Sequence, residues 1–286
     1  MNTLPKISVV TPCLNSEHTI RQTIESVLSQ NYPDFEHIVM DGGSTDGTIG
    51  ILKEYPHLAW QSGQDEGHYD AMNRGVAAAS GDVIGILNAD DCYRDHALHA
   101  VGRAFRAHPD WDALFGDVIF VDSEGHEIFR RKETGYDYDI LRFGMCYVSH
   151  PTLFLTKETY AKTGGYRHRE FLNCCDYDLI LRLGRDGYRV GHVRTLLVAF
   201  RIHEFGQTAD LRVADNMHKE ASQLRREHGL PGGWGGRLLK VFARAKREVL
   251  KLVLRGTCDL VPGGVKMRRH MRDQTTFSSN IGLDEL

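Results

Sequence analysis

The stretch Asp82-Val-Ile-Gly-Ile-Leu-Asn-Ala-Asp-Asp91 decides the fold that we predict for this chain. Its first half is a short apolar run, which is typical of a buried strand. The run ends at Asn88, and Asp90 and Asp91 follow. In an open α/β sheet, ligands bind beyond the carboxyl ends of the strands, where these two carboxylates would lie. Adjacent carboxylates repel each other unless a cation is near, and Mg²⁺ is often held by carboxylates together with phosphate oxygens. The alternative is that the two aspartates only cap the next helix.

Strands alternate with helices on both sides of this stretch. Strands are predicted near residues 6–13, 35–40 and 58–61, and amphipathic helices near residues 20–28, 49–55 and 69–79. Such alternation implies right-handed crossovers and a mainly parallel α/β sheet. Asn15 and Ser16 are the candidate caps of the first helix.

The second half of the chain alternates less regularly. Residues 113–121 and 127–131 flank Asp-Ser-Glu-Gly and predict an antiparallel hairpin. We also predict a strand at residues 147–155, a short helix closed by Gly164 and Gly165, and helices at residues 174–185 and 209–228. Residues 188–193 and 195–202 are strand-like.

The composition is that of a globular protein, with 41% hydrophobic and 26% charged residues. A net charge of −3 argues against a nucleic-acid partner. The six cysteines have no paired metal-site spacing and favour a reducing, cytoplasmic setting. Because the chain enters a predicted strand almost at once, we expect no signal peptide. No run approaches the ~20 apolar residues that cross a bilayer.

A glycine-rich break at residues 232–236 separates a basic segment from the rest. Residues 237–255 contain seven Lys or Arg and one Glu. Their apolar side chains lie on one helical face: Leu238, Phe242, Ala245, Val249, Leu252 and Val253. A basic amphipathic helix can lie on an anionic membrane surface. Alternatively, it packs on its own domain with a solvated basic face. We therefore expect a domain over residues 1–230 and a basic C-terminal helical extension over residues 231–286.

Four polar clusters follow the first four strands or the helices after them, at residues 11–15, 41–48, 65–73 and 88–91. Gly, Asn, Asp and Ser are common turn residues, but four such clusters at one sheet edge indicate a ligand site. A carboxylate such as Asp41 can accept a hydrogen bond from the imide of uracil or from a ribose hydroxyl.

Together these clusters resemble the signature of family 2 glycosyltransferases over about residues 5–210. The matching segments are Thr-Pro-Cys-Leu-Asn-Ser-Glu, Asp-Gly-Gly-Ser-Thr-Asp-Gly-Thr, Asp-Glu-Gly-His-Tyr-Asp-Ala-Met-Asn-Arg-Gly and Leu-Asn-Ala-Asp-Asp. The resemblance implies a GT-A (Rossmann-like) fold and an inverting transferase that uses a nucleotide-diphosphate sugar and Mg²⁺ or Mn²⁺. The third segment is similar to bacterial transferases of surface-polysaccharide assembly. These act on a carbohydrate or lipid-linked acceptor, which implies a site at the inner face of the plasma membrane.

The resemblance also assigns the donor site. Asp41 would hold the nucleobase, and Asp65 and Asp70 would face the nucleotide or donor sugar. The other expected donor-site residues are Thr11, Pro12 and Asn15 in the nucleoside pocket, Arg74 near the pyrophosphate, and Asn88 and Ala89.

The metal ligands implied by the resemblance follow the predicted strand at residues 83–87. The family's Asp-x-Asp element falls on Asn88, Ala89 and Asp90, so an amide replaces the first carboxylate. The metal would rest mainly on Asp90, assisted by Asp91. His203 lies in a segment, residues 201–208, that resembles the family's closing segment, whose histidine often reaches the metal or diphosphate. A structural role is the alternative for this lone histidine.

The catalytic base implied by the resemblance is Asp176, at the start of a predicted helix. The family's preceding acid is replaced by Cys175. Inversion needs one carboxylate that takes the proton of the acceptor hydroxyl as its oxygen attacks the anomeric carbon. Alternatively, Asp176 is only a first-turn acid that the helix dipole stabilises. Asp178 is the next candidate for the base. His150 matches a stretch that borders the acceptor site in relatives.

Two other functions stay open at this point. A sugar-1-phosphate nucleotidylyltransferase uses a related sheet, but residues 11–17 lack its Gly-rich loop with a following Arg and Lys. A nucleotide-sugar-binding protein without turnover is supported only by the Asn88 and Cys175 replacements.

Overall fold

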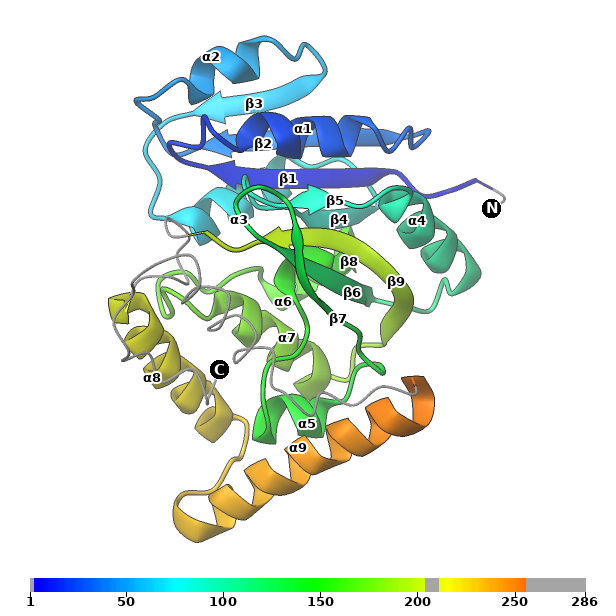
Figure 1. Ribbon diagram of the computed structural model, residues 1–286, viewed down its shortest axis with the longest axis vertical. Coiled ribbons are helices and arrows are strands. Elements are labelled where there is room, and N and C mark those ends of the chain that lie inside the picture. Colours follow the sequence, from blue (N-terminus) through cyan, green and yellow to red (C-terminus); the bar gives the residue numbers. More distant parts are fainter. Residues whose placement is uncertain (1–2, 204–210, 256–286) are drawn as a thin grey trace.

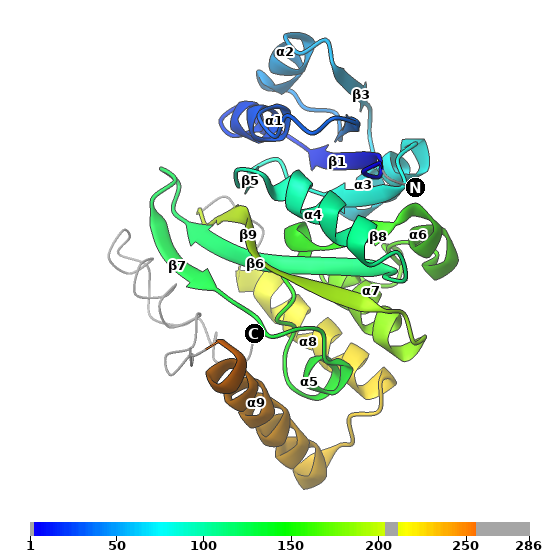
Figure 2. The same cartoon turned by 90° about the vertical axis from the view of Figure 1, so that its right-hand side faces the viewer.

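The computed structural model describes residues 3–203 and 211–255. Within these ranges a nine-stranded sheet has the order β3-β2-β1-β4-β8-β6-β9-β5, and β7 pairs with β6 (Figures 1 and 2). The strands are β1 (Ile7–Cys13), β2 (Phe35–Asp41), β3 (Leu58–Ser62), β4 (Val83–Ile86), β5 (Cys92–Tyr93), β6 (Ala113–Val121), β7 (Glu127–Arg131), β8 (Phe154–Thr156) and β9 (Val190–Arg201). Residues 204–208 of the predicted closing segment, the start of the predicted helix at 209–228 and the extension beyond residue 255 lie outside the described residues.

The first half of the sheet is parallel, as the alternation of strands and helices predicts. β1 pairs in parallel with β2 and β4, and β2 pairs in parallel with β3. Beyond β4 the sheet is mixed, because β8 runs antiparallel to both β4 and β6, whereas β6 and β9 are parallel. The expected α/β architecture is present, but the sheet is mainly parallel only on the β3–β4 side.

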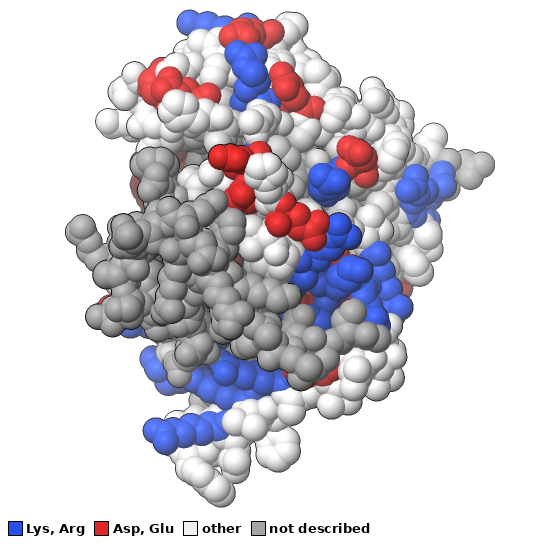
Figure 3. Space-filling model, in the orientation of Figure 1, with Lys and Arg blue, Asp and Glu red and all other residues white. Residues whose placement is uncertain are grey.

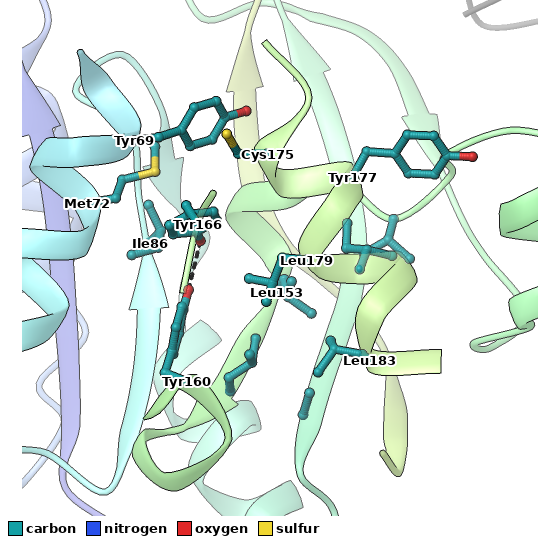
Figure 4. Close-up of a cluster of buried hydrophobic side chains, with 14 of the residues drawn as sticks. Tyr69, Met72, Ile86, Leu153, Tyr160, Tyr166, Cys175, Tyr177, Leu179 and Leu183 are labelled. Atoms are coloured by element: carbon teal, nitrogen blue, oxygen red, sulfur yellow. Dashed lines mark hydrogen bonds between the residues drawn. The ribbon is translucent and has the colours of Figure 1, made fainter. Parts of the chain in front are cut away.

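Helices cover both faces of the sheet, because alternate side chains of the central strands point to opposite faces. Val10 of β1 belongs to a core with α3 (His68–Ala78) and α7 (Cys175–Arg185), whereas Ile7 and Val9 belong to a core with α4 (Ala97–Ala107). Figure 4 shows the first core, in which the hydroxyls of Tyr160 and Tyr166 are hydrogen-bonded at 2.7 Å. The other helices are α1 (Ile20–Leu28), α2 (Thr48–Lys53), α5 (Tyr138–Phe143), α6 (Lys157–Thr163), α8 (Leu211–Glu227) and α9 (Gly233–Arg255).

Most predicted elements are confirmed, and the β6–β7 hairpin has the predicted bounds. The strand predicted at residues 147–155 is wrong over most of its length, because a 3-10 turn at His150–Thr152 precedes the short β8. Pro151 has no N–H for a strand ladder. The two strands predicted at residues 188–202 are one strand, β9, whose pairing with β6 shifts register near Asp117.

The predicted cap of α1 is also wrong. Its N-cap is Thr19, which makes no side-chain capping bond. Asn15 has a φ of 49° and instead ties the loop after β1 to the loop after β2, because its Oδ1 accepts from the Thr45 N–H at 2.9 Å. The polar loop after β1 is therefore bonded to the loop after β2 at the edge of the sheet and does not cap α1.

Helix α9 packs against α5 at one end of the molecule (Figures 1 and 2). α9 thus packs on its own domain, as one alternative holds, but its cations are divided: Arg247 and Lys251 are buried, whereas Arg237 and Arg244 are exposed. Val249 and Leu252, on its apolar face, are exposed as well. The expected boundary near residue 230 stays a prediction.

Candidate active site

A cleft of about 970 Å³ opens where β1 and β4 end. Its wall contains nine of the residues predicted from the sequence: Pro12, Asn15, Asp65, Asn88, Ala89, Asp90, His150, Asp176 and His203. These residues come from the end of β1, from the loops after β1, β3, β4 and β9, and from the starts of the turn before β8 and of α7. The fold therefore brings most, but not all, of the predicted donor, metal and base positions to a single cavity.

The side chains of Asp90 and His203 are in direct contact in the cleft wall. Nε2 of His203 lies 2.9 Å from Oδ2 of Asp90, and both side chains are partly exposed, at 17% and 31%. Within the described residues, no three His, Cys, Asp or Glu side chains are grouped to hold a metal. One carboxylate and one imidazole fit a divalent cation whose remaining ligands come from diphosphate oxygens and water.

Asp91 is buried beneath the cleft wall and is only 1% exposed. Its carboxylate accepts from the backbone N–H of Arg201 at 3.0 Å and from the side-chain amide of Asn88 at 3.1 Å. Burial and the neighbouring charge of Asp90 hold the pKa of Asp91 well above its usual range. The Arg201 guanidinium donates to the Asp90 carbonyl at 3.1 Å and so fixes the turn that carries Asp90. The sequence analysis did not single out Arg201.

Asp176 lies in the first turn of α7 and is half-buried in the cleft wall. Its Oδ1 accepts from the Tyr69 hydroxyl at 3.0 Å and from the Tyr177 N–H at 2.8 Å. Burial lowers the pKa of His68 to about 4 and also lowers that of His150, against the opposing effect of the Asp176 charge. Both imidazoles are therefore neutral at pH 7.

The loop before α7 is held by Glu220 of α8, which the sequence analysis missed. The Glu220 carboxylate accepts from the backbone N–H groups of Leu172, Asn173 and Cys174 at 3.0, 2.9 and 3.0 Å. The first N–H groups of a helix have no acceptor within that helix, and here the Glu220 side chain of α8 is the acceptor for the N–H groups that lead into α7. No sequence signal near residue 220 indicates this contact, because it depends on the packing of α8 beside α7.

The other acids and thiols at the start of α7 point away from the cleft. Asp178 is 0% exposed and forms ion pairs with Arg167 and Arg182, the latter at 2.8 Å. Cys175 is buried, and its thiol donates to the Phe171 carbonyl at 2.9 Å (Figure 4 shows its core position). Asp178 is thus a structural ion-pair partner, which leaves Asp176 as the carboxylate of this segment that reaches the cleft.

Asp41 ends β2 beside the cleft and is 3% exposed. Its carboxylate accepts from the N–H groups of Gly43 and Ser44, each at 3.0 Å, and from the hydroxyls of Ser44 and Ser62. Burial alone raises the pKa of Asp41, but these hydrogen bonds outweigh it and hold the pKa below its usual value. Gly42 allows the Asp65 carboxylate to approach this loop, because a Cβ at Gly42 would lie 2.9 Å from Oδ2 of Asp65.

The three other predicted donor residues lie outside the cleft wall. Thr11 is 0% exposed, and its hydroxyl lies 2.9 Å from Nε2 of His37. Asp70 accepts from the Glu66 N–H at 3.2 Å, and Arg74 donates to the Gln64 carbonyl at 3.4 Å. The contacts of Asp70 and Arg74 support the loop over residues 63–67.

The family model described as Glycosyl transferase family 2 matches residues 8–170, which include the loops after β1, β2 and β4. The chain is a family 2 glycosyltransferase. This match covers more than half of the chain and includes most of the cleft residues, although Asp176 and His203 lie beyond it.

This glycosyltransferase is similar to proteins of polysaccharide and glycolipid biosynthesis. It is 35% identical over 196 residues to the O-antigen biosynthesis protein RfbC of Myxococcus xanthus, a match that covers 66% of this chain and only 15% of that protein. It is 31% identical over 208 residues to a PGL/p-HBAD biosynthesis glycosyltransferase of Mycobacterium tuberculosis (strain ATCC 25177 / H37Ra), over 71% of this chain and 78% of that one.

Solved structures confirm the GT-A fold. S. aureus TarS 1–349 in complex with UDP-GlcNAc gives a TM-score of 0.58 at 16% identity, over 87% of this glycosyltransferase and 81% of that chain. The mannosyltransferase PcManGT from Pyrobaculum calidifontis, in complex with GDP-Man and Mn²⁺, gives 0.59 at 17% identity, over 97% and 82%. At these identities the likeness concerns the fold alone.

Proposed function

We propose that this glycosyltransferase moves one sugar, with inversion, from a nucleotide-diphosphate sugar to a hydroxyl of a carbohydrate or lipid-linked acceptor. The observation that carries the proposal is that Asp176 lines the same cleft as the Asp90–His203 pair. A carboxylate for the acceptor and a cation site for the leaving diphosphate are the two charged parts that this reaction needs.

Asp176 acts as the general base. Its Oδ1 is held by Tyr69 and Tyr177, and Oδ2 has no hydrogen-bond donor within the described parts of the chain. Oδ2 takes the acceptor proton as the hydroxyl oxygen forms its bond to the anomeric carbon. The bond from that carbon to the diphosphate oxygen breaks on the opposite face, and the diphosphate leaves with the electron pair. His150, which also lines the cleft, borders the acceptor.

Asp90 and His203 would hold Mg²⁺ or Mn²⁺, and the buried Asp91 would support the turn that carries Asp90. A bound cation would offset the negative charge that develops on the leaving group. The nucleoside lies against Pro12, Asn15 and Ala89, with Asp65 toward the donor. The Mn²⁺ and GDP-Man named for PcManGT and the UDP-GlcNAc named for TarS support this chemistry without fixing the base or the sugar.

The names of the relatives support an acceptor in polysaccharide or glycolipid assembly. We place the enzyme in the cytoplasm, peripherally on the inner face of the plasma membrane, where a lipid-linked acceptor is available. Within the described residues, no helix is both long and apolar enough to span a bilayer.

One assay separates this function from its two alternatives. The purified chain is incubated with Mn²⁺ and, in turn, UDP-GlcNAc, GDP-Man and related nucleotide sugars, with a lipid-linked saccharide extract as acceptor. We expect acceptor-dependent release of nucleoside diphosphate and a product whose anomeric configuration, read by NMR, is inverted. Donor binding without release would favour a binding protein. Pyrophosphate formed from a sugar-1-phosphate and a nucleoside triphosphate would favour a nucleotidylyltransferase.

A further inference from the structure

Helix α9 is attached to the domain through its charged side. Arg247, 6% exposed, donates to Oε2 of Glu133 at 3.1 Å, and Lys251, 1% exposed, lies 3.9 Å from Oε1 of the same carboxylate. Arg255 pairs with Asp117 further along the helix. An amphipathic helix on a globular domain normally turns its apolar face inward. α9 does the reverse.

The apolar face of α9 is therefore in solvent. The large side chains on this face form what we call the apolar stripe: Trp234, Leu238, Val241, Phe242, Val249, Leu252 and Val253. The exposed Ala245 lies between Phe242 and Val249 on the same side of the helix. Their exposed fractions run from 37% for Leu238 to 76% for Trp234. A contiguous exposed apolar surface of this kind marks an interaction site.

Three cations border the apolar stripe on one side, at Arg237, Lys240 and Arg244. They are spaced by three and four residues, so they lie on one flank of the helix. Among the described residues none of the three has an ion-pair partner, in contrast to Lys246, which lies 2.5 Å from Asp137. In Figure 3, Lys and Arg side chains gather on the lower part of the face shown, in the region of β7 and α9. We call Arg237, Lys240 and Arg244 the basic border.

We propose that α9 docks on an anionic phospholipid surface, with its axis parallel to the bilayer, the apolar stripe inserted between the headgroups and the basic border on the lipid phosphates. A tryptophan at one end suits the membrane–water interface, because its ring is apolar and its N–H is polar. A second copy of the chain fits less well, because two facing stripes would bring two basic borders together, and like charges repel.

The position of α8 relates this surface to the cleft. α8 is 17 residues long, has Val213 of its first turn and Met217 of its middle in the cleft wall, and runs from there toward the start of α9. A helix of that length spans roughly 25 Å. The cleft would thus open about one helix length from the lipid, within reach of the head of a lipid-linked acceptor. Only this last step rests on the proposed function.

Vesicle co-sedimentation of the full chain tests the proposal, with phosphatidylcholine vesicles that contain or lack phosphatidylglycerol and no nucleotide present. A stripe variant carries Val241→Gln, Phe242→Gln and Val249→Gln. A border variant carries Arg237→Gln, Lys240→Gln and Arg244→Gln. The matched control carries Lys53→Gln, Arg103→Gln and Arg106→Gln, three exposed cations on α2 and α4.

We expect the wild type and the control to pellet with anionic vesicles only. The border variant should bind on the order of a hundredfold more weakly. The stripe variant should lose binding at any salt concentration, with an unchanged thermal unfolding curve because its substituted side chains are exposed. Equal pelleting of all four proteins would overturn the proposal. So would a wild-type dimer in sedimentation velocity that the stripe variant dissociates, because the stripe would then join two copies. Lost transfer with intact vesicle binding would reject the proposed function and leave this surface standing.

Discussion

The hydroxyl of Tyr69 in α3 donates to Oδ1 of Asp176 in α7 over 3.0 Å, which joins two helices 107 residues apart in the sequence. Tyr69 is buried, and burial together with the Asp176 charge holds its pKa well above the usual range. It is therefore a neutral donor at all working pH values. One oxygen of the proposed base is thus held in place, and the other accepts no hydrogen bond from the described residues.

Tyr69→Phe should lower the rate of sugar transfer about 10- to 100-fold, because a hydrogen bond to a charged group is lost and Asp176 can rotate. The KM for the donor should not change. The matched control is Tyr160→Phe, which removes a buried hydroxyl of the same core that is bonded to Tyr166 and not to Asp176. If the transfer rate falls equally in the two variants, the Tyr69 hydroxyl contributes to packing of the core and does not hold Asp176 in place.

Asp176→Asn and Asp178→Asn should fail in different ways. Asp176→Asn keeps the shape of the side chain and removes the proton acceptor, so transfer should fall at least 10²-fold while donor binding persists. Asp178→Asn leaves Arg167 and Arg182 partly unpaired at a site that is 0% exposed, so it should cost about 3 kcal/mol or more of unfolding free energy. Urea titration and single-turnover rates distinguish the two. A stable Asp178→Asn protein that binds donor and does not transfer would move the base to Asp178.

Asn88→Asp should make the protein depend on a divalent cation for stability. Asn88 donates to Asp91, which is buried, so an aspartate at residue 88 would remove this amide donor and add a further carboxylate beside Asp90 and Asp91. We expect a lower melting temperature in EDTA and recovery in Mn²⁺, measured by differential scanning fluorimetry. The control, Asn31→Asp, changes an exposed asparagine that bonds only to Ser29. A melting temperature equal to wild type in EDTA would contradict this account of Asn88.

The sequence predicted the parts of the site that depend on strand ends. Pro12, Asn88 and Asp90 follow apolar strands whose carboxyl ends must meet at one sheet edge, and they line one cleft. Asp176 could be predicted only through the family resemblance, because the sequence at the start of a helix does not indicate which part of the molecule that helix faces. The resemblance gives Asn88 only as a donor-site residue in place of a carboxylate, and the structure adds that its side-chain amide donates to the buried Asp91.

The remaining features depend on packing that no local pattern records. Cys175 stands where the family has an acid, and its side chain is buried in the core. A carboxylate buried there would need a hydrogen-bond donor or a cation beside it. The periodicity of α9 gave its two faces correctly but not which one touches the domain. That choice depends on Glu133 and Asp117, more than a hundred residues earlier, which pair with Arg247 and Arg255.

His37 should make the protein less stable in acid. Its side chain is 1% exposed beside Thr11 of β1, and burial lowers its pKa from 6.5 to about 3. Between these values the unfolded chain binds a proton that the folded chain does not, so the unfolding free energy falls as pH drops, by about 1.4 kcal/mol per pH unit. His37→Gln keeps a partner for Thr11 and should flatten the urea-derived stability profile by that slope between about pH 6 and pH 4. His18→Gln, at a side chain that is 91% exposed, should leave the profile unchanged. A wild-type slope in His37→Gln would show that other groups cause the acid sensitivity.

Glu220 should behave as a positioning residue for Asp176. Its carboxylate is the shared acceptor for the N–H groups of residues 172–174, so Glu220→Ala releases the loop that leads into α7. We expect kcat to fall about tenfold with little change in the donor KM, because the base loses its placement and the nucleotide loops are untouched. Hydrogen exchange of amides 172–174 should accelerate, and Glu220→Gln, which keeps one acceptor oxygen, should recover part of both effects. The control is Glu227→Ala, at a partly exposed acid near the end of the same helix. Faster exchange with an unchanged kcat would show that the loop does not position Asp176.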